Sequence, residues 1–187
     1  MIKPMLAHKV GKKEVDWSAK NFIQPKLDGV RCIFTKDGAY SRTGKQFKNI
    51  AHLEEDLEDF FNDNPNSVLD GELYNHDLKH DFEKIISLVR KQKPTDEDRF
   101  EAGNLVQYHV YDTIAEGINY EDRYNWLRMN LPIYKTMTLI ANTTVDCMAE
   151  AKTMHNLHLA QGYEGSMLRT NAGSYRHPLF KTLRNYE

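Results

Sequence analysis

The segment LVQYHVYDTI, residues 105–114, constrains the fold most, because it is the clearest β-strand of the sequence. It is rich in the β-branched and aromatic residues that strands favour. Since successive side chains of a strand point to opposite faces, one face should be apolar and the other more polar. The apolar face carries Val106, Tyr108 and Val110, and the polar face carries Gln107, His109 and Tyr111. The ring of Tyr111 could stack on a flat ligand or lie at the edge of the core.

The other predicted elements follow in no regular β-α-β order. Asp37 and Gly38 predict a tight turn inside a β-hairpin at 29–47. Further strands are expected at 67–74, 135–145 and 163–170, helices at 50–61, 81–92, 119–131 and 146–162, and a polar loop at 93–104. We therefore predict an α+β fold rather than a doubly wound parallel sheet.

The composition is typical of a globular chain. Its 187 residues are enough for one domain with its own core or for two small ones. No apolar run approaches the length of a membrane span, and the N-terminus lacks the apolar segment of a secretory signal. Cys32 and Cys147 are the two cysteines and no CxxC pair occurs, so neither a disulfide framework nor a zinc site is indicated. These features predict a protein of the reducing cytoplasm with no membrane partner.

Positive charge is concentrated at both ends of the sequence. Residues 1–48 hold 11 lysines and arginines against 4 acidic residues, and residues 169–187 hold 4 against 1, although the net charge is −2. Two basic ends that fold against each other would form a positive face for a polyanion such as a nucleic acid. Scattered solubilising charges are the alternative.

Two carboxylates should lie close together on the strand at 67–74. Asp70 and Glu72 share one face of this strand, while Leu69 and Leu73 share the other. Carboxylates so placed repel each other unless solvent, a cation or a metal lies between them. Hard oxygen ligands of this kind suit magnesium. The pair therefore indicates either a magnesium site or an exposed strand face.

Other patterns do not indicate sites. The segment GAYSRTGK imitates a phosphate-binding loop, but five residues rather than four separate its glycines and no serine or threonine follows the lysine. The pairs His76 with His80 and His155 with His158 have metal-binding spacing but no third ligand in an obvious place.

A lysine near the N-terminus indicates the function. Lys26 lies in IQPKLDGVRC, in the loop expected to lead into the hairpin, close to Asp28 and Arg31. The segments SRTG, LDGELY, HVYDTI, GYEGSMLR and LFKTLR follow in that order. Together with PKLDGVR, this ordered set resembles the covalent nucleotidyltransferase superfamily. The resemblance is specifically to the adenylation domain of ATP-dependent DNA ligases, and it covers essentially the whole chain.

The resemblance implies two antiparallel β-sheets flanked by helices around a nucleotide cleft, the ATP-grasp-like fold of DNA ligase and mRNA capping enzyme catalytic domains. It also implies that Lys26 forms lysyl-AMP from ATP, that AMP passes to the 5′-phosphate of a DNA nick, and that the nick is then sealed with the 3′-OH. The attacking amine must be neutral, a form that nearby cations favour. Gly29 would permit a tight turn close to the nucleotide.

The resemblance assigns roles to individual residues. Lys26 and Lys181 are the expected catalytic residues, with Lys181 on the α-phosphate, where it would offset charge in the transition state. Glu72 would hold the ribose, Tyr111 would stack on adenine, and Glu164 would bind the metal, with Glu72 as a further metal ligand. The nucleotide-binding set is completed by Gln24, Arg31, Arg42 and Arg184, and the expected DNA-binding residues are Arg42 and Lys45.

ATP and Mg²⁺ are the implied cofactors, and nicked double-stranded DNA is the implied partner of a monomeric protein of bacterial or viral type. The last lysine motif of the family is K-x-K, whereas this chain has KTLR, so Arg184 would replace the second lysine. We expect residues 1–187 to form a single adenylation domain. We also expect the OB-fold domain that follows in the family to be absent from this chain.

Two alternative functions remain open. RNA ligases and capping guanylyltransferases share the lysine chemistry, and the nucleotide that labels the protein would separate them from DNA ligases. A non-catalytic nucleic-acid-binding module would explain the basic ends. Phosphate binding alone, however, does not require the lysine, the carboxylates and the aromatic residue together.

Overall fold

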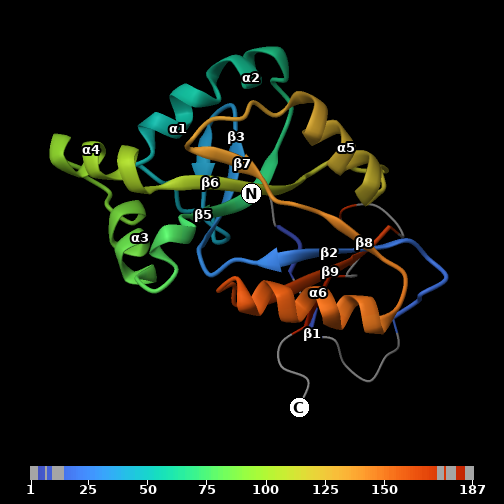
Figure 1. The fold of residues 1–187 in the computed structure, drawn as a ribbon. Helices are drawn as coiled ribbons and strands as arrows, with labels where there is room; N and C mark the ends of the chain where they lie inside the picture. Colours follow the sequence, from blue (N-terminus) through green and yellow to red (C-terminus); the bar gives the residue numbers. More distant parts are fainter. Residues whose placement is uncertain (1–3, 7, 10–14, 172–174, 176–179, 184–187) are drawn as a thin grey trace. The chain divides into compact units, whose positions relative to one another are not determined.

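The computed structural model describes residues 4–6, 8–9, 15–171, 175 and 180–183 (Figure 1). The chain divides into two compact units. The first unit is built mainly from Gly29–Ile114 and Tyr124–Leu139, and the second from Met5–Asp28, Ala115–Arg123 and Ile140–Glu187. Each unit has its own five-stranded sheet, so the predicted α+β fold with two sheets is confirmed. Within the described residues, no helix is both long and apolar enough to cross a membrane.

The sheet of the first unit has the strand order β4-β3-β5-β6-β7. Its strands are β3 (Val30–Thr35), β4 (Gly38–Tyr40), β5 (Leu69–Tyr74), β6 (Gln107–Thr113) and β7 (Met137–Leu139). Neighbouring strands are antiparallel, except that β6 and β7 are parallel. Gly38, the second residue of the predicted turn, has a φ of 127°, a value that favours glycine, and it is the first residue of β4.

Helices cover the apolar face of this sheet. They are α1 (Ala51–Asp56), α2 (Glu58–Asp63), α3 (Phe82–Val89), α4 (Asp96–Leu105) and α5 (Tyr120–Asn130), with a short 3₁₀ helix η1 (His76–Leu78). Their buried side chains pack against the sheet in one core, to which the strands contribute Cys32, Phe34, Leu69, Leu73, Tyr108 and Val110. The predicted apolar face of 105–114 therefore faces this core.

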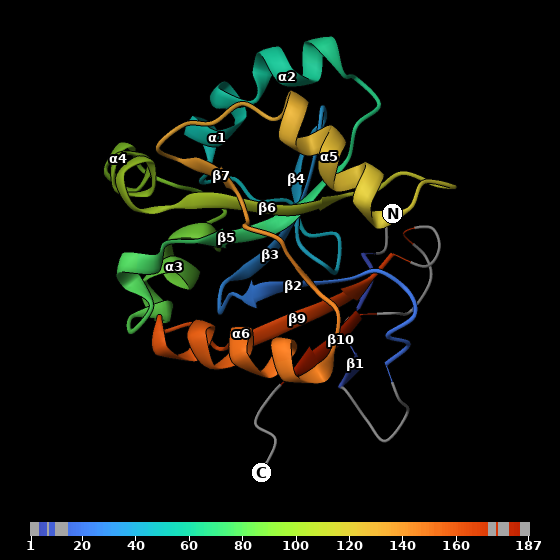
Figure 2. The same ribbon diagram turned by 45° about the vertical axis from the view of Figure 1, so that its right-hand side comes forward.

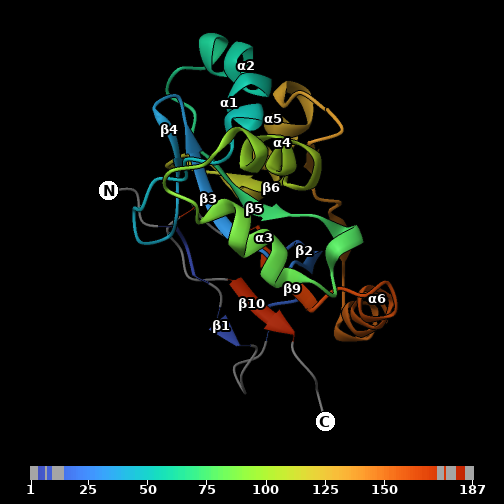
Figure 3. The same ribbon diagram turned by 90° about the vertical axis from the view of Figure 1, so that its left-hand side faces the viewer.

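The sheet of the second unit has the order β1-β10-β9-β2-β8. Its strands are β1 (His8–Lys9), β2 (Asn21–Lys26), β8 (Thr143–Val145), β9 (Gly165–Thr170) and β10 (Phe180–Leu183). They are antiparallel except for β1 and β10, which are parallel. Helix α6 (Met148–Ala160) lies along β9 and β2, as Figures 2 and 3 show. The core of this unit contains Val15, Ile23, Val145, Ala151 and Leu168.

Some local predictions differ from the structure. The predicted loop at 93–104 contains α4, which begins with a capping box between Thr95 and Asp98. The predicted helix at 50–61 is interrupted at Leu57, and the predicted strand at 135–145 consists of β7 and β8, which belong to different sheets. Strand β2 was not among the predicted strands. Pro25 gives a reason, because a residue without a backbone N–H argues against a strand in the interior of a sheet.

Candidate active site

Lys26 is the last residue of β2, rather than part of a loop as predicted, and it lies opposite Gly165 of β9. Its ammonium group forms an ion pair with the Glu164 carboxylate, and the two side chains are only 21% and 25% exposed. The backbone reinforces this contact, because the N–H of Glu164 donates to the carbonyl of Lys26 at 3.2 Å. The structure thus brings the predicted nucleophile together with the predicted metal-binding glutamate, 138 positions further along the chain.

Gln24 lies two residues before Lys26, and strand alternation places both on one face of β2. The Gln24 side chain is only 1% exposed, and its Nε2 has no hydrogen-bond partner within the described part of the chain. A buried donor without an acceptor costs about 1–3 kcal/mol. A ligand that offers an acceptor atom would recover this energy, which fits the predicted contact between Gln24 and adenine.

A second group of predicted residues lies on the polar face of the first unit's sheet. Arg31 of β3 donates to Asp70 of β5 from Nε to Oδ1 at 2.8 Å and from Nη2 to Oδ2 at 2.6 Å. Asp70 is fully buried, and a buried carboxylate requires a charged donor of this kind. An exposed strand face is therefore wrong for Asp70, because Arg31 compensates its charge inside the protein.

Tyr111 and Glu72 extend this group. The Tyr111 hydroxyl donates to Glu72 Oε2 at 3.3 Å, and the Arg31 guanidinium lies 5.6 Å from the centre of the Tyr111 ring. We call Arg31, Asp70, Glu72 and Tyr111 the Arg31 cluster. Three of its members are predicted nucleotide-binding residues, so the structure brings these three together on neighbouring strands of one sheet.

Gly29 precedes β3 and packs against β5. A Cβ atom at this position would lie 2.6 Å from both the Glu72 Cγ and the Leu73 carbonyl oxygen. No larger residue fits without moving the backbone of β5. The glycine is thus required because the backbone at position 29 runs very close to β5 beside Glu72. This is a different reason from the predicted tight turn.

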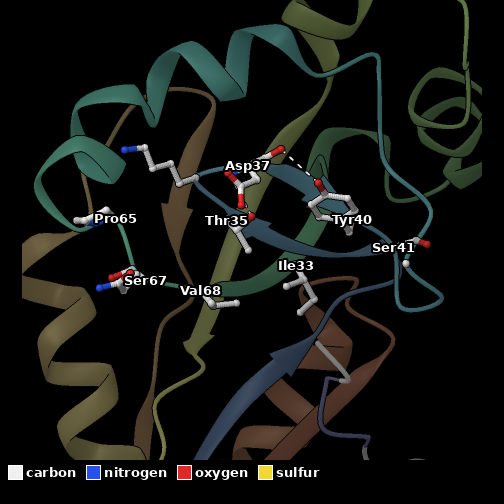
Figure 4. Close-up of a pocket in the computed structure, with 11 residues that line it drawn as sticks. Ile33, Thr35, Asp37, Tyr40, Ser41, Pro65, Ser67 and Val68 are labelled. Atoms are coloured by element: carbon white, nitrogen blue, oxygen red, sulfur yellow. Dashed lines mark hydrogen bonds between the residues drawn. The ribbon is translucent and has the colours of Figure 1, made fainter. Parts of the chain in front are cut away.

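A pocket of about 480 Å³ lies between the β3–β4 hairpin and the segment that leads into β5 (Figure 4). Ile33 and Thr35 line it and alternate with buried core residues on β3, so they share the sheet face of Arg31. The turn at 41–45 forms another part of its wall, and the predicted DNA-binding residues Arg42 and Lys45 are exposed on that turn. These two residues lie outside the Arg31 cluster.

The structure describes only part of the C-terminal segment that contains predicted site residues. The backbone of Lys181 lies in β10, paired with Leu168 of β9 and His8 of β1, whereas Arg184 lies outside the described residues. Within the described ranges, no three histidine, cysteine or acidic side chains gather to hold a metal. Magnesium does not require such a group, because it is commonly bound by one or two carboxylates together with nucleotide phosphates. The carboxylates of Glu164 in the second unit and of Glu72 in the first are each of the ligand type that magnesium takes, so each by itself fits the role predicted for it.

Comparison with solved structures shows a fold shared with DNA ligases. A structure from a study of Lig E DNA ligases is 20% identical with a TM-score of 0.79, and the match covers 100% of this chain and 70% of that one. The Chlorella virus DNA ligase-adenylate is 19% identical with a TM-score of 0.73, covering 99% and 68%. The ATP-dependent DNA ligase of bacteriophage T7 in complex with ATP is 16% identical with a TM-score of 0.67, covering 97% and 68%.

A search of the curated proteins found no match. The family model described as ATP dependent DNA ligase domain matches residues 4–180, which is nearly the whole chain. This match agrees with the ordered segments of the sequence and with the fold. The chain therefore belongs to the family of ATP-dependent DNA ligase domains.

Proposed function

We propose that this domain forms a covalent lysyl-AMP on Lys26 and passes the AMP to the 5′-phosphate of nicked double-stranded DNA. The partly buried pair of Lys26 and Glu164 carries the proposal. The Lys26 Nζ attacks the α-phosphorus of ATP, so that an N–P bond forms and the bond to the pyrophosphate oxygen breaks. The 5′-phosphate of the nick then attacks the same phosphorus and releases Lys26. Finally, the 3′-OH attacks the adenylated 5′-phosphate and expels AMP.

In this scheme Glu164 first pairs with Lys26 and then binds magnesium. In the structure its carboxylate is paired with Lys26, and such a neighbour favours the protonated amine, which has no lone pair for attack. The ion pair therefore holds Lys26 in position but must open before the reaction. Magnesium, for which Glu164 would supply a carboxylate, would neutralise phosphate charge. Once the Glu164 carboxylate is engaged in this way, it no longer favours the charged form of Lys26.

The Arg31 cluster supplies the groups for the nucleoside. Tyr111 would stack on adenine, Glu72 would accept hydrogen bonds from the ribose hydroxyls, and Arg31 would contact the phosphates. Asp70 supports this role, because its two hydrogen bonds fix the orientation of the Arg31 guanidinium. Gln24 would donate to the adenine ring from the same strand as Lys26.

The remaining assignments follow from the sequence: Lys181 and Arg184 would contact the α-phosphate region. Arg42 and Lys45, which are exposed, would contact the DNA around the 5′-phosphate.

The test is the intact mass of the protein after incubation with magnesium and either ATP or GTP, followed by addition of nicked DNA. We expect one AMP per chain from ATP, none from GTP, and loss of the AMP from the protein when a nick with a 5′-phosphate is added. Labelling by GTP would indicate a capping-type enzyme instead. Transfer only to a nick in RNA would indicate an RNA ligase, and the absence of any adduct would contradict the proposal.

A further inference from the structure

Three buried polar side chains of the second unit form a hydrogen-bonded group that the proposed chemistry does not use. Ser166 Oγ of β9 lies 3.2 Å from the Nδ1 of His155 and 2.7 Å from the Nδ1 of His158, both on α6. Ser166 is 0% exposed, and the two histidines are 8% and 5% exposed. Polar groups in such a setting are costly unless each is hydrogen-bonded, so the three side chains form a tight link between helix and strand.

The hydrogen bonds of this group determine which Nδ1 atoms of the two histidine rings carry a proton. A serine hydroxyl has one proton and can donate to only one of the two Nδ1 atoms, so the other histidine must donate from its own Nδ1. Burial lowers the pKa of both histidines, and His155 lowers that of His158 further. Both rings are therefore neutral at neutral pH, with a proton on at least one Nδ1.

His158 contacts the chain on both sides of Glu164. Its carbonyl accepts a hydrogen bond from the N–H of Tyr163 at 3.0 Å, and its ring packs edge-on against the Tyr163 ring with 6.1 Å between the ring centres. Its Nδ1 bonds to Ser166, two residues after Glu164. One histidine thus holds the residues that flank the predicted metal-binding glutamate.

The hydrogen-bonded group lies at the Lys26 end of the β2–β9 pair. Ser166 lies opposite Pro25, and Gly165 lies opposite Lys26, in the β2–β9 register. The link from α6 to Ser166 holds β9 from the face of the sheet that α6 covers.

We propose that His158 is a positioning residue for Glu164, acting together with Ser166 and His155. The proposal rests on the proposed function, because it assigns His158 the task of keeping Glu164 beside Lys26. A side chain that only orients a catalytic or metal-binding residue affects the reaction rate through the position of that residue. Loss of such a partner typically lowers metal affinity or activity about 10–100-fold.

The test is single-turnover formation of lysyl-AMP over a range of ATP concentrations at fixed magnesium. His158→Leu and Ser166→Ala should each lower the rate at saturating ATP roughly 10–100-fold while leaving the half-saturating ATP concentration unchanged. His158→Asn should keep most of the rate, because an asparagine amide can occupy the place of Nδ1. His52→Leu is the matched control, since the His52 ring bonds to the Val106 carbonyl in the first unit and should affect stability alone.

A wild-type rate in Ser166→Ala would overturn the proposal, as would an equal loss in His158→Asn and His158→Leu. Ser166→Ala removes a single oxygen atom and keeps the test decisive if His158→Leu does not fold. Failure of the wild-type protein to form lysyl-AMP would instead contradict the proposed function. Nitrogen NMR of the histidine rings tests the group without turnover: we expect a proton on at least one Nδ1, and a change at both rings in Ser166→Ala.

Discussion

Arg31 serves two neighbours, since it compensates the buried Asp70 carboxylate and lies beside the Tyr111 ring. Arg31→Ala would leave the Asp70 charge buried without this partner. We expect the free energy of unfolding to fall by about 3–5 kcal/mol, measured by urea denaturation. Asp70→Asn added to Arg31→Ala should restore part of this loss, because the remaining group is neutral. An Arg31→Ala protein as stable as the wild type would show that Asp70 does not depend on Arg31.

Tyr111 provides a residue-level test of nucleotide binding. Tyr111→Ala should weaken ATP binding by about 1–3 kcal/mol, as in other cases where a base stacks on an aromatic side chain. Tyr111→Phe is the control, because it keeps the ring and loses only the hydrogen bond to Glu72. Calorimetry in a Lys26→Ala background avoids adduct formation. Equal affinities of the alanine variant and its parent would place Tyr111 at the core edge, without a role in stacking.

The N-terminal cap of helix α4 allows a test at the level of secondary-structure elements. Its capping box joins the Thr95 hydroxyl to the Asp98 N–H at 3.2 Å and the Asp98 carboxylate to the Thr95 N–H at 2.9 Å. Thr95→Ala should lower the free energy of unfolding by about 1 kcal/mol and speed amide exchange in the first turn of α4. Thr153→Ala is a suitable control, because Thr153 is exposed in the middle of α6. No difference between the two variants would show that the cap does not stabilise α4.

The two elements that were missed, α4 and β2, lack a clear local sequence pattern, each for a different reason. The first turn of α4 is acidic and its apolar residues follow no clear helical period, so only the capping box could have revealed it. Strand β2 combines the apolar Phe22 and Ile23 with Gln24, Pro25 and Lys26. Its place in the sheet depends on pairing with β8 and β9, which are distant in sequence. By contrast, the strand at 105–114 could be predicted because its alternation is local.

At the scale of the whole molecule, the order of the segments could be predicted but not their contacts. The sequence indicated Lys26 and Glu164 separately, whereas their ion pair follows from the register of β2 and β9. The burial of Asp70 likewise depends on Arg31, which reaches it from the neighbouring strand. Contacts of this kind arise from long-range strand pairing, and a single sequence contains no local signal for them.

Stability should fall as the pH decreases below about 6.5. Burial, with a contribution from His76, lowers the pKa of His109 to about 4, and burial also lowers the pKa values of His52, His155 and His158. In the unfolded chain these histidines titrate near 6.5 and bind more protons than the folded state below that pH, so acid favours unfolding. For His109 alone the loss is about 3 kcal/mol when the pH has fallen below about 4.

Urea denaturation at pH 7.5, 6 and 5 measures this dependence. The free energy of unfolding should decrease at each step, and His109→Gln should show a shallower decrease than the wild type. Constant stability over this range would mean that the buried histidines do not titrate differently in the folded and unfolded states.

Lys26 as the nucleophile is the central claim, and the site of AMP attachment tests it most directly. The measurement is peptide mapping by mass spectrometry of the wild type, Lys26→Ala, Lys26→Arg and Lys20→Ala after incubation with ATP and magnesium. Lys20 is the control, because it lies just before β2 and pairs with Glu121. We predict one AMP on Lys26 in the wild type and in Lys20→Ala. Neither Lys26 variant should carry AMP, since alanine has no amine and the arginine guanidinium stays protonated. An AMP adduct on Lys26→Ala, or on any other residue of the wild type, would contradict the account.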